Sequence, residues 1–278
     1  MHLLHGDCLD ILPTLRAGSF DLVVTSPPYN LGIGYNSFKD TAPRGEYLAW
    51  CQSWAAEIKR VMTDDASFFL NVGAAPANPL MPHQLLLALT DGPDPLFILQ
   101  NTFHWIKSVT IETPRGEHVS AGHFKPINSK RFVNDCHEYV FHLTKSGSVP
   151  LDRRAAGVPY ADKSNIARWG HTGGRDLRCR GNNWFIPYET IQSRDKERPH
   201  PATFPVALVS QCLLLHGKGG STRLLDPFLG IGSSAVAACR NGISSFTGIE
   251  LDAHYLQTAR QRLQAEQTKT ASELPFDS

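Results

Sequence analysis

Short apolar runs alternate with amphipathic stretches in the first hundred residues. Residues 20–25 (FDLVVT) form an apolar run rich in β-branched side chains, and the prolines that follow stop it, which predicts a buried strand. Between residues 47 and 62 the apolar side chains recur at three- and four-residue spacing, which predicts an amphipathic helix. Residues 67–72 (SFFLNV) predict a second strand, and residues 81–90 another helix. This order of strand, loop, helix and strand is typical of a parallel α/β sheet.

A similar pattern returns in the last third of the chain. It predicts, in order, a helix over 204–216, a strand over 223–225, a glycine-rich loop, a helix over 233–241, a strand over 245–249 and a helix over 252–266. The stretch between the two patterned regions is polar, and we expect loops and short elements there, with one core strand in CHEYVFHLTK at 136–145. Residues 268–278 are expected to form a flexible tail.

Charge separates the middle of the chain from the rest. The 278 residues carry a net charge of +1, but residues 105–200 hold 16 Lys and Arg against 10 Asp and Glu. The middle is therefore +6 and the remainder −5. A polyanion-binding insertion would show this asymmetry, and so would an ordinary solvated face.

Several classes of protein are excluded by residue types. The six cysteines, at positions 8, 51, 136, 179, 212 and 239, form no CxxC pair, so we expect reduced thiols and no metal. Neither HExxH nor HxE with PCxxC occurs, which leaves zinc proteases and zinc deaminases without support. The sequence has no stretch of 18 apolar residues and no signal-peptide pattern, so we expect a cytoplasmic location.

The strongest single motif is DPFLGIGSS at 226–234, directly after a predicted strand. Glycines after a strand let the backbone approach a ligand closely. Glu250, eighteen residues beyond Gly232, ends the next predicted strand, where its carboxylate can accept from both hydroxyls of a ribose. A lone GxG would favour an ordinary tight turn, but the strand context and the acidic strand end favour a nucleoside-binding half-site.

Neighbouring residues indicate which nucleoside this half-site would hold. A dinucleotide site usually has a third glycine, and Ala235 stands at that position. The Asp226 carboxylate would repel a pyrophosphate but would attract the ammonium group of S-adenosylmethionine. A methyl donor is therefore favoured over a nicotinamide dinucleotide.

A second motif, TSPPYN at 25–30, follows the first predicted strand. Its prolines fix the backbone so that a carbonyl and the Ser26 hydroxyl can converge on one small group. Two acceptors on the protons of an exocyclic amine can draw its nitrogen toward a tetrahedral, nucleophilic state. Tyr29 offers a ring on which an extruded base can stack. An ordinary proline turn uses the same residue types, so the motif gains its meaning from the nucleoside half-site.

Together, SPPY and DPFLGIG resemble the signature motifs of the DNA amino-methyltransferases that modify adenine N6 or cytosine N4. The catalytic motif precedes the cofactor motif here, as in the β class of that family. LLHGDCLDIL at 3–12 and HPATFP at 200–205 resemble further family segments. The resemblance covers about residues 1–145 and 198–265.

The resemblance implies a fold and a division of the chain. We expect an α/β fold with a Rossmann-like, seven-stranded methyltransferase sheet that is circularly reordered. Residues 1–145 would form the catalytic half, 146–197 a target-recognition insertion, and 198–267 the cofactor-binding half. Basic DNA-contacting residues would begin near residue 107.

Site residues follow from matching these motifs one position at a time. The catalytic set is Ser26, Pro27, Pro28 and Tyr29. The set expected to bind S-adenosylmethionine is Asp7, Cys8, Ser26, His200, Pro201, Phe204, Asp226, Pro227, Phe228, Gly230, Gly232, Ser233, Glu250 and Leu251. The basic residues expected to contact DNA phosphates are Lys125, Lys130, Arg131, Arg175, Arg178 and Arg180.

The implied activity is site-specific transfer of a methyl group from S-adenosylmethionine to a flipped base in double-stranded DNA. Adenine-specific members usually have DPPY, whereas Ser26 stands at the first position here, as in most cytosine-N4 members, which favours cytosine N4. Adenine N6, an RNA substrate, and a catalytically silent nucleic-acid-binding protein on the same scaffold are the alternatives. A homodimer and a cognate restriction endonuclease are further candidate partners. No cysteine follows a proline, so the covalent thiol route to cytosine C5 is not expected.

Overall fold

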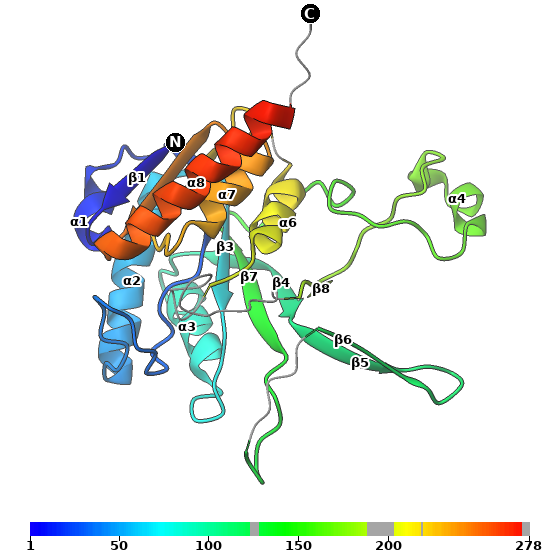
Figure 1. The fold of residues 1–278 in the computed structure, drawn as a ribbon, viewed down its shortest axis with the longest axis horizontal. Coiled ribbons are helices and arrows are strands. Elements are labelled where there is room, and N and C mark those ends of the chain that lie inside the picture. Colours follow the sequence, from blue (N-terminus) through cyan, green and yellow to red (C-terminus); the bar gives the residue numbers. More distant parts are fainter. Residues whose placement is uncertain (123–127, 188–202, 218, 274–278) are drawn as a thin grey trace, which may run out of the picture.

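The computed structural model describes residues 1–122, 128–187, 203–217 and 219–273. In these ranges eight strands form one sheet in the order β1-β10-β9-β2-β3-β7-β4-β8, and β5 and β6 form a separate hairpin (Figure 1). The first five strands in that order are parallel, and β7 is antiparallel to both of its neighbours. The strand bounds are β1 His2–His5, β2 Phe20–Thr25, β3 Met62–Val72, β4 Ile98–Ile106, β5 Ser108–Glu112, β6 His118–Gly122, β7 His137–Thr144, β8 Asn183–Phe185, β9 Arg223–Asp226 and β10 Ser245–Glu250.

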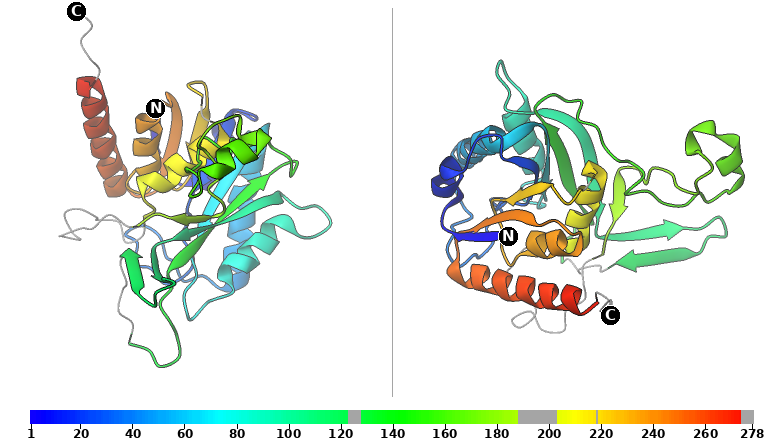
Figure 2. Two further views of the ribbon diagram at one scale, coloured as in Figure 1. Left: turned by 90° about the vertical axis from the view of Figure 1, so that its right-hand side faces the viewer. Right: turned by 90° about the horizontal axis from the view of Figure 1, so that it is seen from above.

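Helices cover both faces of the sheet (Figure 2). Helices α1, α2 and α3 pack on one face, and α6, α7 and α8 pack on the other. Alternate side chains of β2 serve the two layers, since Leu22 and Val24 join the α6–α8 cluster while Val23 joins the α2–α3 cluster. The helix bounds are α1 Cys8–Ile11, η1 Leu12–Thr14, α2 Arg44–Val61, α3 Met81–Thr90, α4 Ser164–Arg168, η2 Gly170–Thr172, α6 Val206–His216, α7 Ser233–Arg240 and α8 Ala253–Glu273.

The α/β fold with a mostly parallel sheet, expected from the sequence, is confirmed, but the sheet has one strand more than expected. The additional strand, β8, comes from residues 146–197, the segment expected to be an insertion, and pairs with β4 in a register that places Trp184 beside Trp105. β4 begins in residues 91–104, for which no element was predicted, and the β5–β6 hairpin lies in the basic middle, where loops and short elements were expected. β4 carries polar side chains near the sheet edge, and the hairpin strands, although polar and apolar residues alternate in them, are short and largely exposed.

Two peripheral features depart from the compact body. The β5–β6 hairpin and the arm around α4 both project on the side of β8 (Figure 1).

Helix α8 continues to Glu273, six residues past the expected boundary at 267, while residues 274–278 of the expected tail lie outside the described residues. Among the described residues, no helix is both long and apolar enough to cross a membrane.

Strand β2, which carries the SPPYN loop, lies between β9 and β3 in the sheet. Its buried side chains should therefore contribute strongly to the stability of the fold. Leu22 is fully buried, so Leu22→Ala should lower the free energy of unfolding by about 2–5 kcal/mol. Leu87→Ala, at a position 55% exposed on α3, is the matched control and should change it by less than about 0.5 kcal/mol. Urea titration followed by tryptophan fluorescence measures both. Equal effects would contradict the placement of β2 in the core.

Candidate active site

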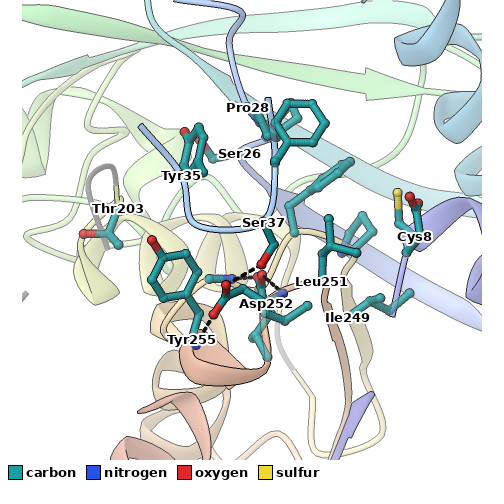
Figure 3. A pocket seen from close by; sticks show the side chains of 18 of the residues that line it. Cys8, Ser26, Pro28, Tyr35, Ser37, Thr203, Ile249, Leu251, Asp252 and Tyr255 are labelled. Carbon is teal, nitrogen blue, oxygen red and sulfur yellow. Dashed lines mark hydrogen bonds between the residues drawn. The ribbon is translucent and has the colours of Figure 1, made fainter. Parts of the chain in front are cut away.

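A cleft lies at the carboxyl ends of β2, β9 and β10, and both sequence motifs contribute to its wall (Figure 3). It encloses about 930 Å³ of space, part of it open to solvent. Strands β2 and β9 are neighbours in the sheet, although 201 residues separate Thr25 from Asp226. Adjacent parallel strands end at the same edge, so their pairing brings the SPPYN and DPFLGIG loops together.

Two glycines with left-handed backbone shape the DPFLGIG loop. Gly230 has φ of 54° and Gly232 has φ of 83°. A Cβ at Gly232 would lie 2.8 Å from the Cβ of Ala259, so glycine allows the start of α7 to pack against α8. Gly230 lines the cleft, whereas Gly232 does not.

Asp226, expected to bind the cofactor directly, lies behind the cleft wall and does not line it. Its side chain is fully buried and accepts hydrogen bonds from the Thr25 hydroxyl (2.6 Å), the Ser234 hydroxyl and the Phe228 amide (3.1 Å). Burial raises the pKa of Asp226 to about 6, although these three donors act in the opposite direction. The carboxylate therefore ties the end of β2 to the first turn of α7.

Glu250, at the end of β10, lines the cleft as expected. One carboxylate oxygen accepts from the Gly230 amide at 2.7 Å and the other from the Asp252 amide at 2.8 Å. Burial raises the pKa of Glu250. Each carboxylate oxygen has two lone pairs, so the side chain keeps acceptor capacity for ligand hydroxyls.

Most of the other residues expected to bind the cofactor also reach the cleft. Asp7 caps α1 by accepting from the Leu9 amide at 2.8 Å, and burial raises the pKa of the Cys8 thiol beside it. His200 and Pro201 lie outside the described residues. The remaining expected residues that line the cleft are Ser26, Phe204, Pro227, Phe228, Ser233 and Leu251.

All four expected catalytic residues, Ser26 to Tyr29, line the cleft. The Ser26 hydroxyl and the Tyr29 hydroxyl are 2.5 Å apart. The Tyr47 hydroxyl donates to the carbonyl of Pro28 at 2.8 Å, which fixes the proline segment against α2. The motif thus presents a hydroxyl, a rigid backbone and an aromatic ring to one space.

The loop that follows, residues 30–43, completes the wall. The buried carboxylate of Asp40 accepts from three backbone amides in the first residues of the loop, those of Asn30, Leu31 and Ile33. Ser37 donates to Asp252 at 2.6 Å, which links this loop to the start of α8 (Figure 3). Burial acts to raise the pKa of Asp252, but hydrogen bonds from Ser37 and from the backbone amides at the start of α8 lower it below its usual value.

Sequence reasoning missed several residues of this wall. Asp252 directly precedes the C-terminal helix, and a search for helix N-caps would have found it. Most of the others come from the 30–43 loop and from helices α2 and α8, where no motif marks them, while Thr203 lies within the HPATFP segment just before α6. These residues are Tyr35, Ser37, Phe38, Trp50, Thr203 and Tyr255. Among the described residues, no group of three or more His, Cys, Asp and Glu side chains is placed to hold a metal ion.

The expected DNA-contacting residues lie away from the cleft, in two exposed segments. Lys130 and Arg131 lie between β6 and β7, and Arg175, Arg178 and Arg180 follow η2. All five are exposed, and Arg180 also donates to the Ala156 carbonyl at 3.0 Å. Lys125 lies outside the described residues.

The raised pKa of Asp226 predicts a pH dependence of stability. The folded-state pKa of about 6 exceeds the ordinary value of 3.8, so stability from this group is present below pH 4 and is lost as the pH rises through 6. A shift of this size corresponds to about 3 kcal/mol. Asp226→Asn should lack this loss, so its stability relative to the wild type should rise between pH 4 and 6. Urea titrations across that range measure it, and a constant difference would contradict the assignment.

Comparisons with known proteins agree with this geometry. The family model for N6 and N4 DNA methylases matches residues 20–261. The type II methyltransferase M.ScaI of Streptomyces caespitosus is 31% identical over 276 residues, covering 95% of this chain and 81% of its own. The DNA adenine methyltransferase YhdJ of Escherichia coli K12 is 24% identical, covering 98% and 85%.

Solved structures share the fold. The cytosine-N4-specific PvuII DNA methyltransferase superposes with a TM-score of 0.68 at 18% identity, covering 97% of this chain and 92% of its own. TTHA0409 of Thermus thermophilus, in a complex with S-adenosyl-L-methionine, gives a TM-score of 0.59 at 22% identity, covering 95% and 93%. The matched family model spans both motif loops and the strands that carry them, and the chain therefore belongs to the N6/N4 DNA methylase family.

Proposed function

We propose that this DNA methyltransferase modifies the N4 amine of a cytosine flipped out of double-stranded DNA. S-adenosylmethionine is the methyl donor. Ser26 is the observation that carries the choice of cytosine, because a hydroxyl stands where adenine-specific members of the family usually have a carboxylate. Its position in the cleft, 2.5 Å from the Tyr29 hydroxyl, supports a direct role with the amine.

The charge of the cleft fits a cationic cofactor. Three carboxylates line it, those of Asp7, Glu250 and Asp252, and Asp226 lies behind the wall. Of the lining residues in the described part of the chain, none is Lys, Arg or His. Such a site attracts a sulfonium and an ammonium and repels a pyrophosphate. Phe228, Ile249 and Leu251 add apolar wall beside the Glu250 carboxylate, which suits an adenosine.

The SPPY segment would position the target amine. The Ser26 hydroxyl and the carbonyl of Pro27 would accept the two amine protons, and the Tyr29 ring would stack on the base. When bound, S-adenosylmethionine supplies an electrophilic methyl group for in-line displacement. The protein contributes mainly by holding the amine at the correct place and orientation.

Adenine N6 is the second candidate target, and one observation favours it. YhdJ, which matches nearly the whole chain, is described as an adenine methyltransferase. The Ser26 hydroxyl can accept from either amine, so only the identity of the methylated nucleoside distinguishes cytosine N4 from adenine N6. The type II relatives also make a cognate endonuclease acting on the same site a candidate partner, alongside a second copy of this chain.

Analysis of the modified nucleoside tests the proposal. Plasmid DNA methylated by the protein and digested to nucleosides should contain N4-methylcytosine, identified by mass spectrometry. Ser26→Ala should lower the single-turnover rate about 100-fold, because it removes one acceptor on the developing positive charge, while cofactor binding stays unchanged. N6-methyladenine as the product, or a wild-type rate in Ser26→Ala, would contradict it.

A series at Tyr29 separates stacking from hydrogen bonding. Tyr29→Ala should lose most activity, whereas Tyr29→Phe and Tyr29→Trp should keep part of it, since stacking contributes about 1–3 kcal/mol per base. Single-turnover methylation measures all three. An equal loss in every variant would assign the whole effect to the hydroxyl.

Cofactor affinity tests the role of Glu250. Glu250→Ala should weaken S-adenosylmethionine binding in calorimetry, because the carboxylate is the acceptor for the ribose hydroxyls, while DNA affinity changes little. Glu57→Ala is a matched control on α2, where Glu57 pairs with Arg60 outside the cleft. Unchanged cofactor affinity in Glu250→Ala would contradict the assignment.

Salt dependence tests the DNA contacts. Reversing the charge of Arg175, Arg178 or Arg180 should flatten the slope of log affinity against log salt by roughly 0.9 for each DNA phosphate that the variant no longer neutralises. Lys269→Glu, an exposed change near the end of α8, should leave the slope unchanged. Slopes identical to the wild type in all three arginine variants would exclude these residues from the DNA interface.

A further inference from the structure

A chain of hydrogen bonds leads from the cleft into the sheet. The Ser26 and Tyr29 hydroxyls are 2.5 Å apart, and the Tyr29 hydroxyl donates to Oε2 of Glu138 at 3.1 Å. Asn71 Nδ2 donates to both the Tyr29 hydroxyl (2.9 Å) and Glu138 Oε2 (2.6 Å). Glu138 lies at the start of β7 and does not line the cleft. Among the described contacts, its path to a substrate in the cleft runs through Tyr29 and Ser26.

Glu138 is placed in a defined electrostatic setting. Lys107, between β4 and β5, donates to Oε1 of Glu138 at 3.2 Å. The Lys107 side chain is 17% exposed and the Glu138 side chain 12%. Among the described residues, Lys107 and Tyr29 bond to Glu138, Tyr35 interacts with it electrostatically, and Asn71 on β3 is uncharged. Lys107 is thus the cation that forms an ion pair with Glu138.

Glycine at position 73 leaves the space in which Tyr29 and Glu138 meet. A Cβ there would lie 3.1 Å from carbons of both side chains. Any larger residue at position 73, directly after β3, would press on the side chains that form this hydrogen bond. The contact is therefore built by three separate segments, the SPPYN loop, the end of β3 and the start of β7.

An ionised carboxylate at the end of the chain sets the direction of every hydrogen bond in it. Glu138 can only accept, so the single proton of the Tyr29 hydroxyl points to it. Ser26 must then donate to Tyr29, since the phenol proton is already used. The lone pairs of Ser26 Oγ stay available to accept from an amine in the cleft. With the opposite direction, Tyr29 would occupy one of these lone pairs and the proton of Ser26 would have to point elsewhere.

We propose that Glu138 is a positioning residue that orients this chain and takes up the proton released by the target amine. The proposal rests on the proposed function only in requiring an exocyclic amine as substrate. The amine lone pair forms the new N–C bond as the C–S bond breaks and its electron pair stays on sulfur. The cationic nitrogen then gives one proton to Ser26 Oγ, Ser26 passes its proton to Tyr29, and Tyr29 passes its own to Glu138. The carboxylic acid returns the proton to solvent.

Glu138→Gln tests this role with little change in shape. An amide cannot take up the proton in either orientation, so the single-turnover rate should fall about 100-fold, as for loss of a general base. Calorimetric affinities for S-adenosylmethionine and DNA should stay near the wild type. Glu57→Gln, which removes a carboxylate from an ion pair elsewhere on the surface, should keep the full rate.

The pH profile distinguishes proton uptake from a structural role. The wild-type rate should fall on the acid side as the carboxylate becomes protonated, and Glu138→Gln should lack this acid limb. Lys107→Met removes the neighbouring cation, so the carboxylate protonates at higher pH and the limb should move upward. Tyr29→Phe keeps the ring but breaks the chain, and should also lose the limb.

Each outcome decides the proposal. A wild-type rate in Glu138→Gln, or an acid limb that persists in that variant, would overturn it. If Glu138→Gln fails to fold, Lys107→Met decides: an upward shift of the limb supports the proposal and an unmoved limb overturns it. Product analysis separates the two hypotheses, because N6-methyladenine would overturn the choice of cytosine and leave the role of Glu138 standing.

Discussion

The buried carboxylate of Asp226 is the contact on which the candidate site depends. Thr25 donates to it from the end of β2 and Ser234 from the first turn of α7, so one side chain joins the two loops that carry the motifs. Leaving a buried polar group without its partner costs about 1–3 kcal/mol, and more for a charge. The spacing between the SPPYN and DPFLGIG loops is therefore fixed by the folded core and does not require a ligand.

That constraint separates two chemical environments in one site. The cleft wall is acidic, with Asp7, Glu250 and Asp252 on it and no basic residue among the described lining residues. Beyond Tyr29, the environment changes to a hydrogen-bonded group at the ends of β3 and β7, where Lys107 neutralises Glu138. The acidic wall would suit a cationic methyl donor. The carboxylate of Glu138, close by, would suit an amine that must lose a proton.

The parts of this site that the sequence could predict are those carried by contiguous motifs. Ser26 to Tyr29 and part of the DPFLGIG loop line one cleft, and the sequence could indicate them because strand, loop and helix signals lie side by side in the chain. Glu138, Lys107 and Asn71 were not found, since each lies on a different segment and only the β3-β7-β4 pairing brings them together. For Asp226 the motif identified the residue but not its contacts. That Thr25 and Ser234 donate to its carboxylate is visible only in the structure.

Hydrogen exchange on S-adenosylmethionine binding tests most directly whether the two loops form one site. Both loops line the same cleft, so the cofactor should slow amide exchange at residues 228–233 and 250–252 and also at Ser26, Tyr29 and Asn30. The two segments are about 200 residues apart in the chain, so separate peptides report on each of them. Protection confined to the DPFLGIG and β10 segments, with exchange at the SPPYN loop unchanged, would contradict the account.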